Sequence, residues 1–288
     1  MKESHDLDSR LLPINDSRPP ADPKHSSEQP RIQESRANQG NSLRADSFQL
    51  TAMLWLAGIC GLAVLPTTLM DVSIASFLAT HPLPTSYGEV IELAAEYGNG
   101  IGITLIIVAV VVLSRRRRWS APRLVTLAAG GGAVATIAKL FVLRPRPNSL
   151  PLEWLAQDIA WIWSFDPTLS QLASFEPATR AFPSASLASA TAMTVGIWMV
   201  VPKFRYLASV LCVATMLQQI ECGAHFASDL FGSAAVGLAW SYICFHPSWL
   251  GGIFDRLEPE LPPYPESANP SKRQVDQKAK TQTVREAA

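Results

Sequence analysis

The sequence lacks an excess of charge of either sign. Lysine and arginine together number 24, aspartate and glutamate also number 24, and charged residues make up only 17% of the chain. Because no net positive field exists to attract a polyanion, the composition argues against a nucleic-acid partner. Electrostatic recognition by this protein must therefore depend on local groups of charges.

Cysteine is also scarce, and no two cysteines form a motif. The four are isolated in sequence, at Cys60, Cys212, Cys222 and Cys244. They have none of the paired spacings that are typical of zinc sites or redox motifs. We interpret them as small apolar side chains of helices and expect no cysteine chemistry and no metal site.

Hydropathy divides the chain into an apolar middle and two polar ends. The mean hydropathy of +0.14 is high for a soluble domain of this length. Residues 1–48 and 251–288 bury too little apolar surface to offset their ordering entropy, so we predict two disordered tails. The first tail lacks the apolar core and cleavage site of a signal peptide, so the first apolar segment should remain as an anchor. Residues 49–250 then form one membrane domain.

The middle of the chain contains six apolar runs close to the roughly 20 residues that cross a bilayer. They lie at residues 50–70, 99–114, 124–143, 185–201, 206–222 and 228–246. The sequence therefore predicts an all-α, integral membrane six-helix bundle. Three consecutive glycines, Gly130 to Gly132, are expected to let neighbouring helices approach closely.

Basic residues predict the orientation of this bundle. They crowd the connection at 115–123 and recur at Lys203 and Arg205, so these two connections should be cytoplasmic. The connection at 71–98 has no lysine or arginine and belongs on the opposite side, as does the long segment 144–182. We expect a multi-pass protein, of a bacterial inner membrane, with both tails in the cytoplasm.

Three segments near the outer ends of the predicted helices carry polar residues that a purely structural bundle does not need. In the first, Lys139 and Arg146 lie seven residues apart, about two helical turns, so both cations can face one anion. The alternative is that Lys139 extends from a helix end towards water. In the second, Pro183 and Ser184 open a helix, where free N–H groups and hydroxyls favour a phosphate; ordinary helix capping is the alternative.

The third segment pairs His225 with Asp229, four residues apart and able to share one helix face. A carboxylate beside an imidazole fixes its tautomer and leaves the other nitrogen free as a nucleophile or base. The alternative is a helix-capping role for Asp229 or Ser228 beside a structural histidine.

Together the three segments resemble the type 2 phosphatidic acid phosphatase and vanadium haloperoxidase superfamily. That family has lysine, six residues and Arg-Pro; then Pro-Ser-Gly-His; then Ser-Arg, five residues, histidine, three residues and aspartate. The first motif matches fully at 139–147, and the resemblance covers roughly residues 50–246. This chain departs from the pattern at Ser186, where the family has histidine, and at Gln218-Gln219, where the family has Ser-Arg.

The resemblance implies a membrane phosphatase that hydrolyses a lipid phosphate or a polyprenyl diphosphate at the outer face, with no metal or cofactor. His225 is expected to attack phosphorus and form a phosphohistidine, with Asp229 orienting it. Lys139, Arg146 and Ser184 are expected to bind phosphate oxygens. Membrane lipids are the expected partners.

The departures change what this site can do. Serine is a poor general acid, so we expect Ser186, in place of histidine, to lower the rate of the protonation step by roughly 10²- to 10⁴-fold. Gln219 deletes one bidentate contact with phosphate. A diphosphate, whose departing phosphate needs little protonation, suits such a site, and His81 or Glu221 are candidate substitute acids. The alternative function is a non-catalytic member that binds or moves a phospholipid, and a haloperoxidase ranks third; retention of His225 with Asp229 favours catalysis.

Overall fold

The structure is a computed structural model that describes residues 47–82, 84–113, 117–150, 163–166 and 179–258. All of them belong to one compact unit, Leu43–Leu261. The two predicted tails lie outside the described residues, except for 47–48 and 251–258.

The described residues are mostly helical, which confirms the prediction of an all-α fold. The helices are α2 (Ser47–Thr68), α3 (Asp71–Thr80), α4 (Thr85–Ala95), α5 (Gly100–Leu113), α6 (Ala121–Phe141), α8 (Ala185–Val200), α9 (Arg205–Glu221), α10 (Ala227–Phe245) and α11 (Leu250–Leu257). Short 3-10 helices occur at Glu96–Gly98, Arg118–Ser120, Pro147–Ser149 and Pro202–Phe204, and two short strands are β1 (Val142–Leu143) and β2 (Ser164–Phe165).

Each of the six predicted apolar runs coincides with one helix: α2, α5, α6, α8, α9 or α10. By length and hydropathy, two described stretches are able to cross a membrane, namely α2 and Arg118–Phe141. A third arises if α4 and α5, which meet at a bend of 67°, form one broken span. The chain is a membrane protein, and the count of six spans stays a prediction.

Helix α10 packs against α2, α6 and α8, and α8 also packs against α9. The contacts between α6 and its neighbours are close because glycines lie there, as the sequence predicts. A methyl group at Gly131 would lie 3.0 Å from the carbonyl oxygen of Ala188, and one at Gly130 would overlap the ring of Trp240. Leu124, Leu187 and other fully buried apolar side chains fill the space between these helices.

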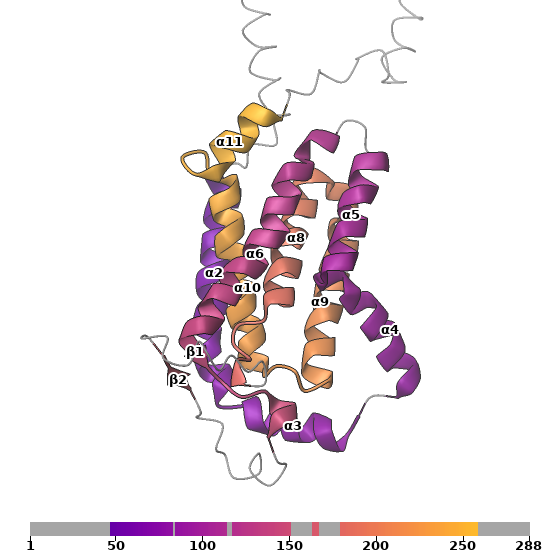
Figure 1. The fold of residues 1–288 in the computed structure, drawn as a ribbon, viewed down its shortest axis with the longest axis vertical. Coiled ribbons are helices and arrows are strands. Elements are labelled where there is room, and N and C mark those ends of the chain that lie inside the picture. The colour runs from indigo at the N-terminus through magenta and orange to yellow at the C-terminus, as the bar shows by residue number, and fades with distance from the viewer. Residues whose placement is uncertain (1–46, 83, 114–116, 151–162, 167–178, 259–288) are drawn as a thin grey trace, which may run out of the picture. The chain divides into compact units, whose positions relative to one another are not determined.

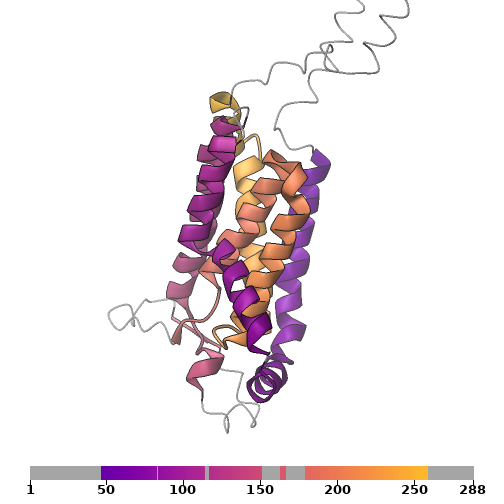
Figure 2. The ribbon, with the colours of Figure 1, turned by 90° about the vertical axis from the view of Figure 1, so that its right-hand side faces the viewer.

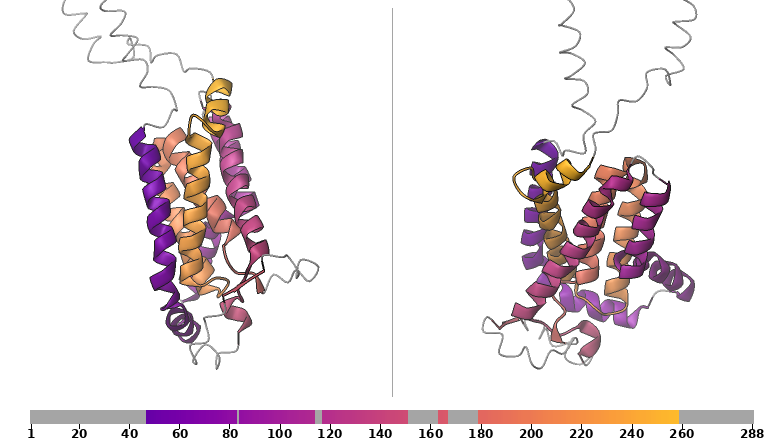
Figure 3. Two further views of the ribbon diagram at one scale, coloured as in Figure 1. Left: turned by 90° about the vertical axis from the view of Figure 1, so that its left-hand side faces the viewer. Right: turned by 45° about the horizontal axis from the view of Figure 1, so that its top comes forward.

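The two ends of the bundle differ in composition. The described part of the α5–α6 connection, residues 117–120, and the α8–α9 connection lie at the same end as α11 (Figures 1 and 2). The three predicted motifs lie at the opposite end, with β1, β2 and α3, and α3 runs across that end of the bundle (Figures 1 and 3). The basic connections and the three motifs therefore lie at opposite ends of the bundle, which agrees with the arrangement that the basic residues predict.

Helix α11 occupies a segment that the sequence assigns to the C-terminal tail. Buried Arg123 anchors it, donating to Asp255 at 2.7 Å and pairing with Glu258 at 3.0 Å. The Arg123 guanidinium also lies over the rings of Phe245 and Phe254, with its Cζ 5.0 Å and 5.4 Å from the two ring centroids. The packed part of the chain therefore extends to residue 258.

Candidate active site

Backbone hydrogen bonds bring the three motifs together. After α6 ends, β1 pairs antiparallel with β2. The backbone of Arg144 then forms two hydrogen bonds of 2.8 Å: its N–H donates to Thr179 O, and its carbonyl accepts from Ala181 N. Asn148 N donates to Gly223 O at 2.9 Å, which joins the first motif to the third. Gly223 has φ +63, a conformation that favours glycine and allows this tight turn.

Arg144 is the hub of a buried polar cluster that the sequence analysis did not single out. Its Nη1 donates to Ser228 Oγ at 2.8 Å and to Asp229 Oδ1, and its Nη2 donates to Asp71 Oδ2 at 2.5 Å. Trp163 lies over the guanidinium, with the ring centroid 4.1 Å away. A buried charge is costly unless it is paired and hydrogen-bonded, and Arg144 has both kinds of partner.

His225 lies near Asp229, but the two do not share a helix face as the spacing predicted, because His225 precedes the first residue of α10. His225 is only 4% exposed in the connection between α9 and α10, and its Nδ1 lies 3.8 Å from Asp229 Oδ2. That separation is longer than a hydrogen bond, and catalytic contacts often shorten only when substrate binds. The same Asp229 oxygen accepts from Phe226 N at 2.9 Å, which satisfies a free N–H at the start of α10.

Burial is the main cause that lowers the pKa of His225 below its ordinary value. The positive charges of Lys139 and Arg146 lower this pKa further, while the Asp229 carboxylate opposes them. Two conclusions follow. Both predicted phosphate-binding cations act on the charge of His225, and an imidazole with a lowered pKa is neutral at neutral pH, the form that the predicted nucleophile requires.

Arg180 fixes the end of α6 on which Lys139 lies. Its guanidinium is 1% exposed and donates from Nη1 to the carbonyl oxygens of Lys139, at 2.7 Å, and Leu140, at 2.8 Å. These are carbonyls that a helix end leaves without an intrahelical partner. The sequence analysis missed Arg180; its signal was an arginine four residues before the Ser184 helix start.

Ser184 caps α8, which was the alternative reading of the second motif. Its Oγ accepts from Leu187 N at 3.4 Å and lies 3.1 Å from Ser186 Oγ. Its backbone N–H donates to Ser233 Oγ at 2.7 Å, and Ser233 donates to the carbonyl of Asp229 at 2.6 Å. Ser184 thus links the start of α8 to the first turns of α10.

At the two diverged positions the structure places neutral side chains bonded to close neighbours. Ser186 contacts the Ser184 hydroxyl, and Gln219 Nε2 donates to Gln218 Oε1 at 2.9 Å. The Gln219 backbone has a separate role, because its carbonyl accepts from His225 N at 3.2 Å.

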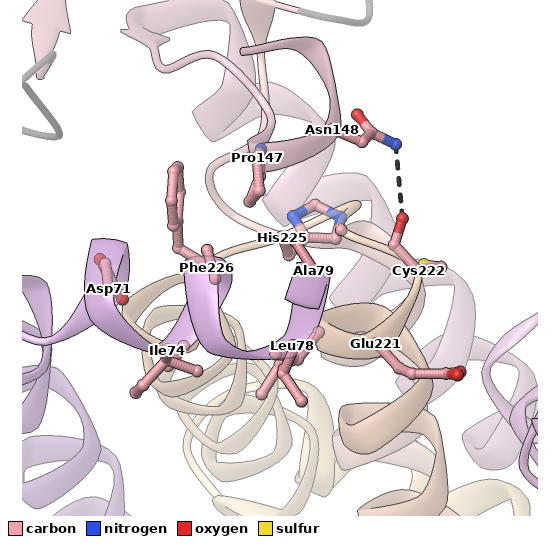
Figure 4. A pocket seen from close by; sticks show the side chains of 14 residues that line it. Asp71, Ile74, Leu78, Ala79, Pro147, Asn148, Glu221, Cys222, His225 and Phe226 are labelled. Atoms are coloured by element: carbon pink, nitrogen blue, oxygen red, sulfur yellow. Dashed lines mark hydrogen bonds between the residues drawn. The ribbon is translucent and has the colours of Figure 1, made fainter. Parts of the chain in front are cut away.

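A cavity of about 180 Å³ lies against His225 (Figure 4). Its walls come from α3, from the 147–148 segment and from the end of α9, and its lining includes no lysine or arginine among the described residues. The full lining is Asp71, Ile74, Ala75, Leu78, Ala79, Pro147, Asn148, Ile220, Glu221, Cys222, Gly223, His225, Phe226 and Ala227. Lys139 and Arg146 are thus not among the residues that line this cavity.

The two candidate substitute acids lie in different surroundings. Glu221 lines the cavity, but its carboxylate is directed away from His225 (Figure 4) and lies near Gly88 of α4. His81 is exposed, stacks on Phe77 with ring centroids 4.6 Å apart, and does not line the cavity. Neither side chain replaces the missing histidine beside His225 in this arrangement.

Comparison with known proteins identifies one family. A family model described as the PAP2 superfamily matches residues 121–250, from the start of α6 to the first residue of α11. The crystal structure of a transmembrane PAP2 type phosphatidylglycerolphosphate phosphatase from Bacillus subtilis is similar, with 16% sequence identity and a TM-score of 0.46. The match covers 73% of this chain and 96% of that chain. No curated protein matches the chain.

Proposed function

Because the chain belongs to the PAP2 superfamily, we propose that it is a membrane phosphatase that hydrolyses a lipid phosphate or a polyprenyl diphosphate. One observation carries the proposal: buried His225 faces Asp229 while Lys139 and Arg146 lie close enough to lower its pKa. A nucleophile, its orienting carboxylate and two cations for phosphate oxygens are the groups that phosphoryl transfer to histidine needs.

In the proposed reaction, Nε2 of neutral His225 attacks phosphorus and forms a P–N bond. The bond from phosphorus to the leaving oxygen breaks, and that oxygen keeps the electron pair. Water then attacks the phosphohistidine, which releases phosphate and returns the electron pair to Nε2. Lys139 and Arg146 stabilise the charge on the phosphate oxygens, and Asp229 stabilises the Nδ1 proton of the imidazolium.

Substrate choice follows from the acid that this site lacks. The Ser186 hydroxyl contacts Ser184 and is not acidic at neutral pH, so the leaving oxygen must depart without a strong proton donor. We infer that the protein favours a diphosphate, whose departing phosphate is stable as an anion, over a phosphomonoester with an alkoxide leaving group. The site end of the bundle is proposed to face outward, opposite the basic connections.

The proposal is tested by measuring phosphate release by the detergent-purified protein from phosphatidic acid and from a polyprenyl diphosphate. We expect release from the diphosphate, at least 10³-fold less with His225→Ala, and a gain on phosphatidic acid with Ser186→His. His81→Ala is the matched control, because this histidine is exposed and does not line the cavity. Its rates should equal those of the wild type.

The same samples separate catalysis from the alternative function. Gln219 and Ser186 are neutral where the family has charged or acidic groups, which is the observation that favours a phospholipid-binding protein. Absence of release by the wild type on both substrates, with phosphatidic acid still bound in a Lys139-dependent way, would replace the phosphatase proposal with that alternative.

A further inference from the structure

Asp71, the first residue of α3, is buried among groups that come from distant parts of the chain. It is 1% exposed, and its Oδ1 accepts from Ser228 N at 2.9 Å. Its Oδ2 accepts from Ser228 Oγ and from Arg144 Nη2, the latter at 2.5 Å. Both oxygens of this carboxylate are therefore committed to the segment that carries Asp229.

The cluster continues from Asp71 to His225 through two further side chains. Arg144 uses its two Nη atoms on two carboxylates, Asp71 on one side and Asp229 on the other. Asp229 likewise divides its oxygens: Oδ1 is bonded to Arg144, and Oδ2 faces His225 Nδ1. Arg144 and the Phe226 N–H together set the rotation of the Asp229 carboxylate, and Asp71 is the second carboxylate that holds Arg144 in place.

We propose that Asp71 is a positioning residue of the active site, which acts through Arg144 to hold the Asp229 carboxylate towards His225. The inference rests on the proposed function for its chemistry, because orientation of His225 matters only if His225 reacts. Arg144 faces two carboxylates, so it neutralises neither completely. The second carboxylate limits how strongly Arg144 attracts Asp229 and leaves negative charge on Asp229 for the imidazole.

The charged side chains around His225 come from several elements. Lys139 comes from α6, Arg146 from the segment that follows β1, and Asp229 from α10. Asp71 and Glu221 line the same cavity as His225, and Arg144 lies between the two aspartates. Against this background, neutralising Asp71 removes one negative charge and lets Arg144 attract Asp229 more strongly. Both effects destabilise the imidazolium and lower the pKa of His225.

The test measures the pKa of His225 directly, by NMR titration of the full-length protein in detergent with ¹³C-labelled histidine. The protein has five histidines, and the His225 signal is the one that disappears in His225→Gln. We expect Asp71→Asn to lower the pKa of His225 by roughly half a unit or more. Asp71→Ser, a smaller neutral variant whose hydroxyl oxygen is still an acceptor, provides the second measurement if the Asn variant does not fold.

Two controls distinguish positioning from general loss of structure. Asp255→Asn neutralises an aspartate that pairs with a buried arginine at the other end of the bundle, so it should leave the pKa of His225 unchanged. Ser228→Ala removes a hydrogen-bonding hydroxyl from the same cluster without changing any charge, and should move the pKa by less than Asp71→Asn does. An unchanged pKa in both neutral Asp71 variants would overturn the inference.

The titration does not depend on activity, so the two proposals fail separately. An inactive wild-type protein with a shifted His225 pKa in Asp71→Asn would remove the phosphatase proposal and keep the Asp71–Arg144–Asp229 linkage. An active wild type with no shift would keep the phosphatase and remove the linkage. Where activity is present, the acid limb of kcat/KM should move to lower pH in Asp71→Asn in parallel with the NMR titration.

Discussion

At His225, burial and the charges of two cations all disfavour protonation of the imidazole. Solvent is excluded from a side chain that is 4% exposed, and Lys139 and Arg146 further disfavour a positive charge there. The neighbouring Asp229 carboxylate opposes them. Since the cations are also the proposed ligands of the phosphate oxygens, substrate that neutralises them should raise the pKa of His225 and so favour the imidazolium that forms during attack.

The protonation state of His225 predicts how the reaction rate depends on pH. Attack requires neutral His225, and its pKa lies below the ordinary value of about 6.5. The rate constant kcat/KM should therefore stay level from neutral pH down to this ordinary value. It should fall only at lower pH, where the pH passes the lowered pKa and His225 becomes protonated. The profile is measured with the preferred lipid substrate in buffers of constant ionic strength. Half-maximal kcat/KM at a pH above 7 would contradict the assigned state of His225.

Among the elements, the end of α6 matters most, because it carries Lys139 and because Arg180 closes it. Apolar runs were sufficient to predict α6 and the five other long helices, since a run of bilayer length has few alternatives to a helix. They were not sufficient for α3 and α4, which are too short to cross a bilayer alone. The motif spacing also predicted that His225 lies near Asp229, but His225 precedes α10, so a shared helix face is not the reason for their proximity.

The parts of the site that the sequence did not predict depend on pairing between distant segments. Asp71 is hydrogen-bonded to Ser228, which is 157 residues away in sequence. Arg180 is hydrogen-bonded to the end of α6, about 40 residues away. No local period connects such residues, so only the folded chain shows them together. Ser184 is a different case, since its capping role was an open alternative and the structure shows that role.

Replacement of Arg180 by methionine tests the role of the α6 terminus. The change removes the donor shared by the Lys139 and Leu140 carbonyls, and each buried carbonyl left without a partner costs about 1–3 kcal/mol. We expect a lower unfolding temperature in detergent together with a raised KM, because Lys139 loses its fixed backbone. Arg123→Met removes an equally buried arginine at the other end of the bundle and should lower the unfolding temperature without raising KM. Equal effects of both variants on KM would exclude a specific role for Arg180.

At the scale of the whole molecule, the two ends of the bundle have different tasks. One end carries the basic connections and α11, which Arg123 anchors. The other collects α3, the strands and the starts of α8 and α10 around His225. If the basic end is cytoplasmic, as the positive charges predict, the proposed substrate phosphate is reached from outside.

Cysteine accessibility in intact cells tests this orientation. Cys222, in the turn after α9, is exposed at the site end, whereas Cys212 and Cys244 are buried. With Cys60 replaced by alanine, a membrane-impermeant thiol reagent should label Cys222 in intact cells. The matched variant moves the thiol to the other end, with Cys222→Ser and Ser248→Cys, because Ser248 is exposed in the connection before α11. That thiol should react only after the cells are opened, and the reverse pattern would mean that the site faces the cytoplasm and acts on lipid phosphates of the inner leaflet.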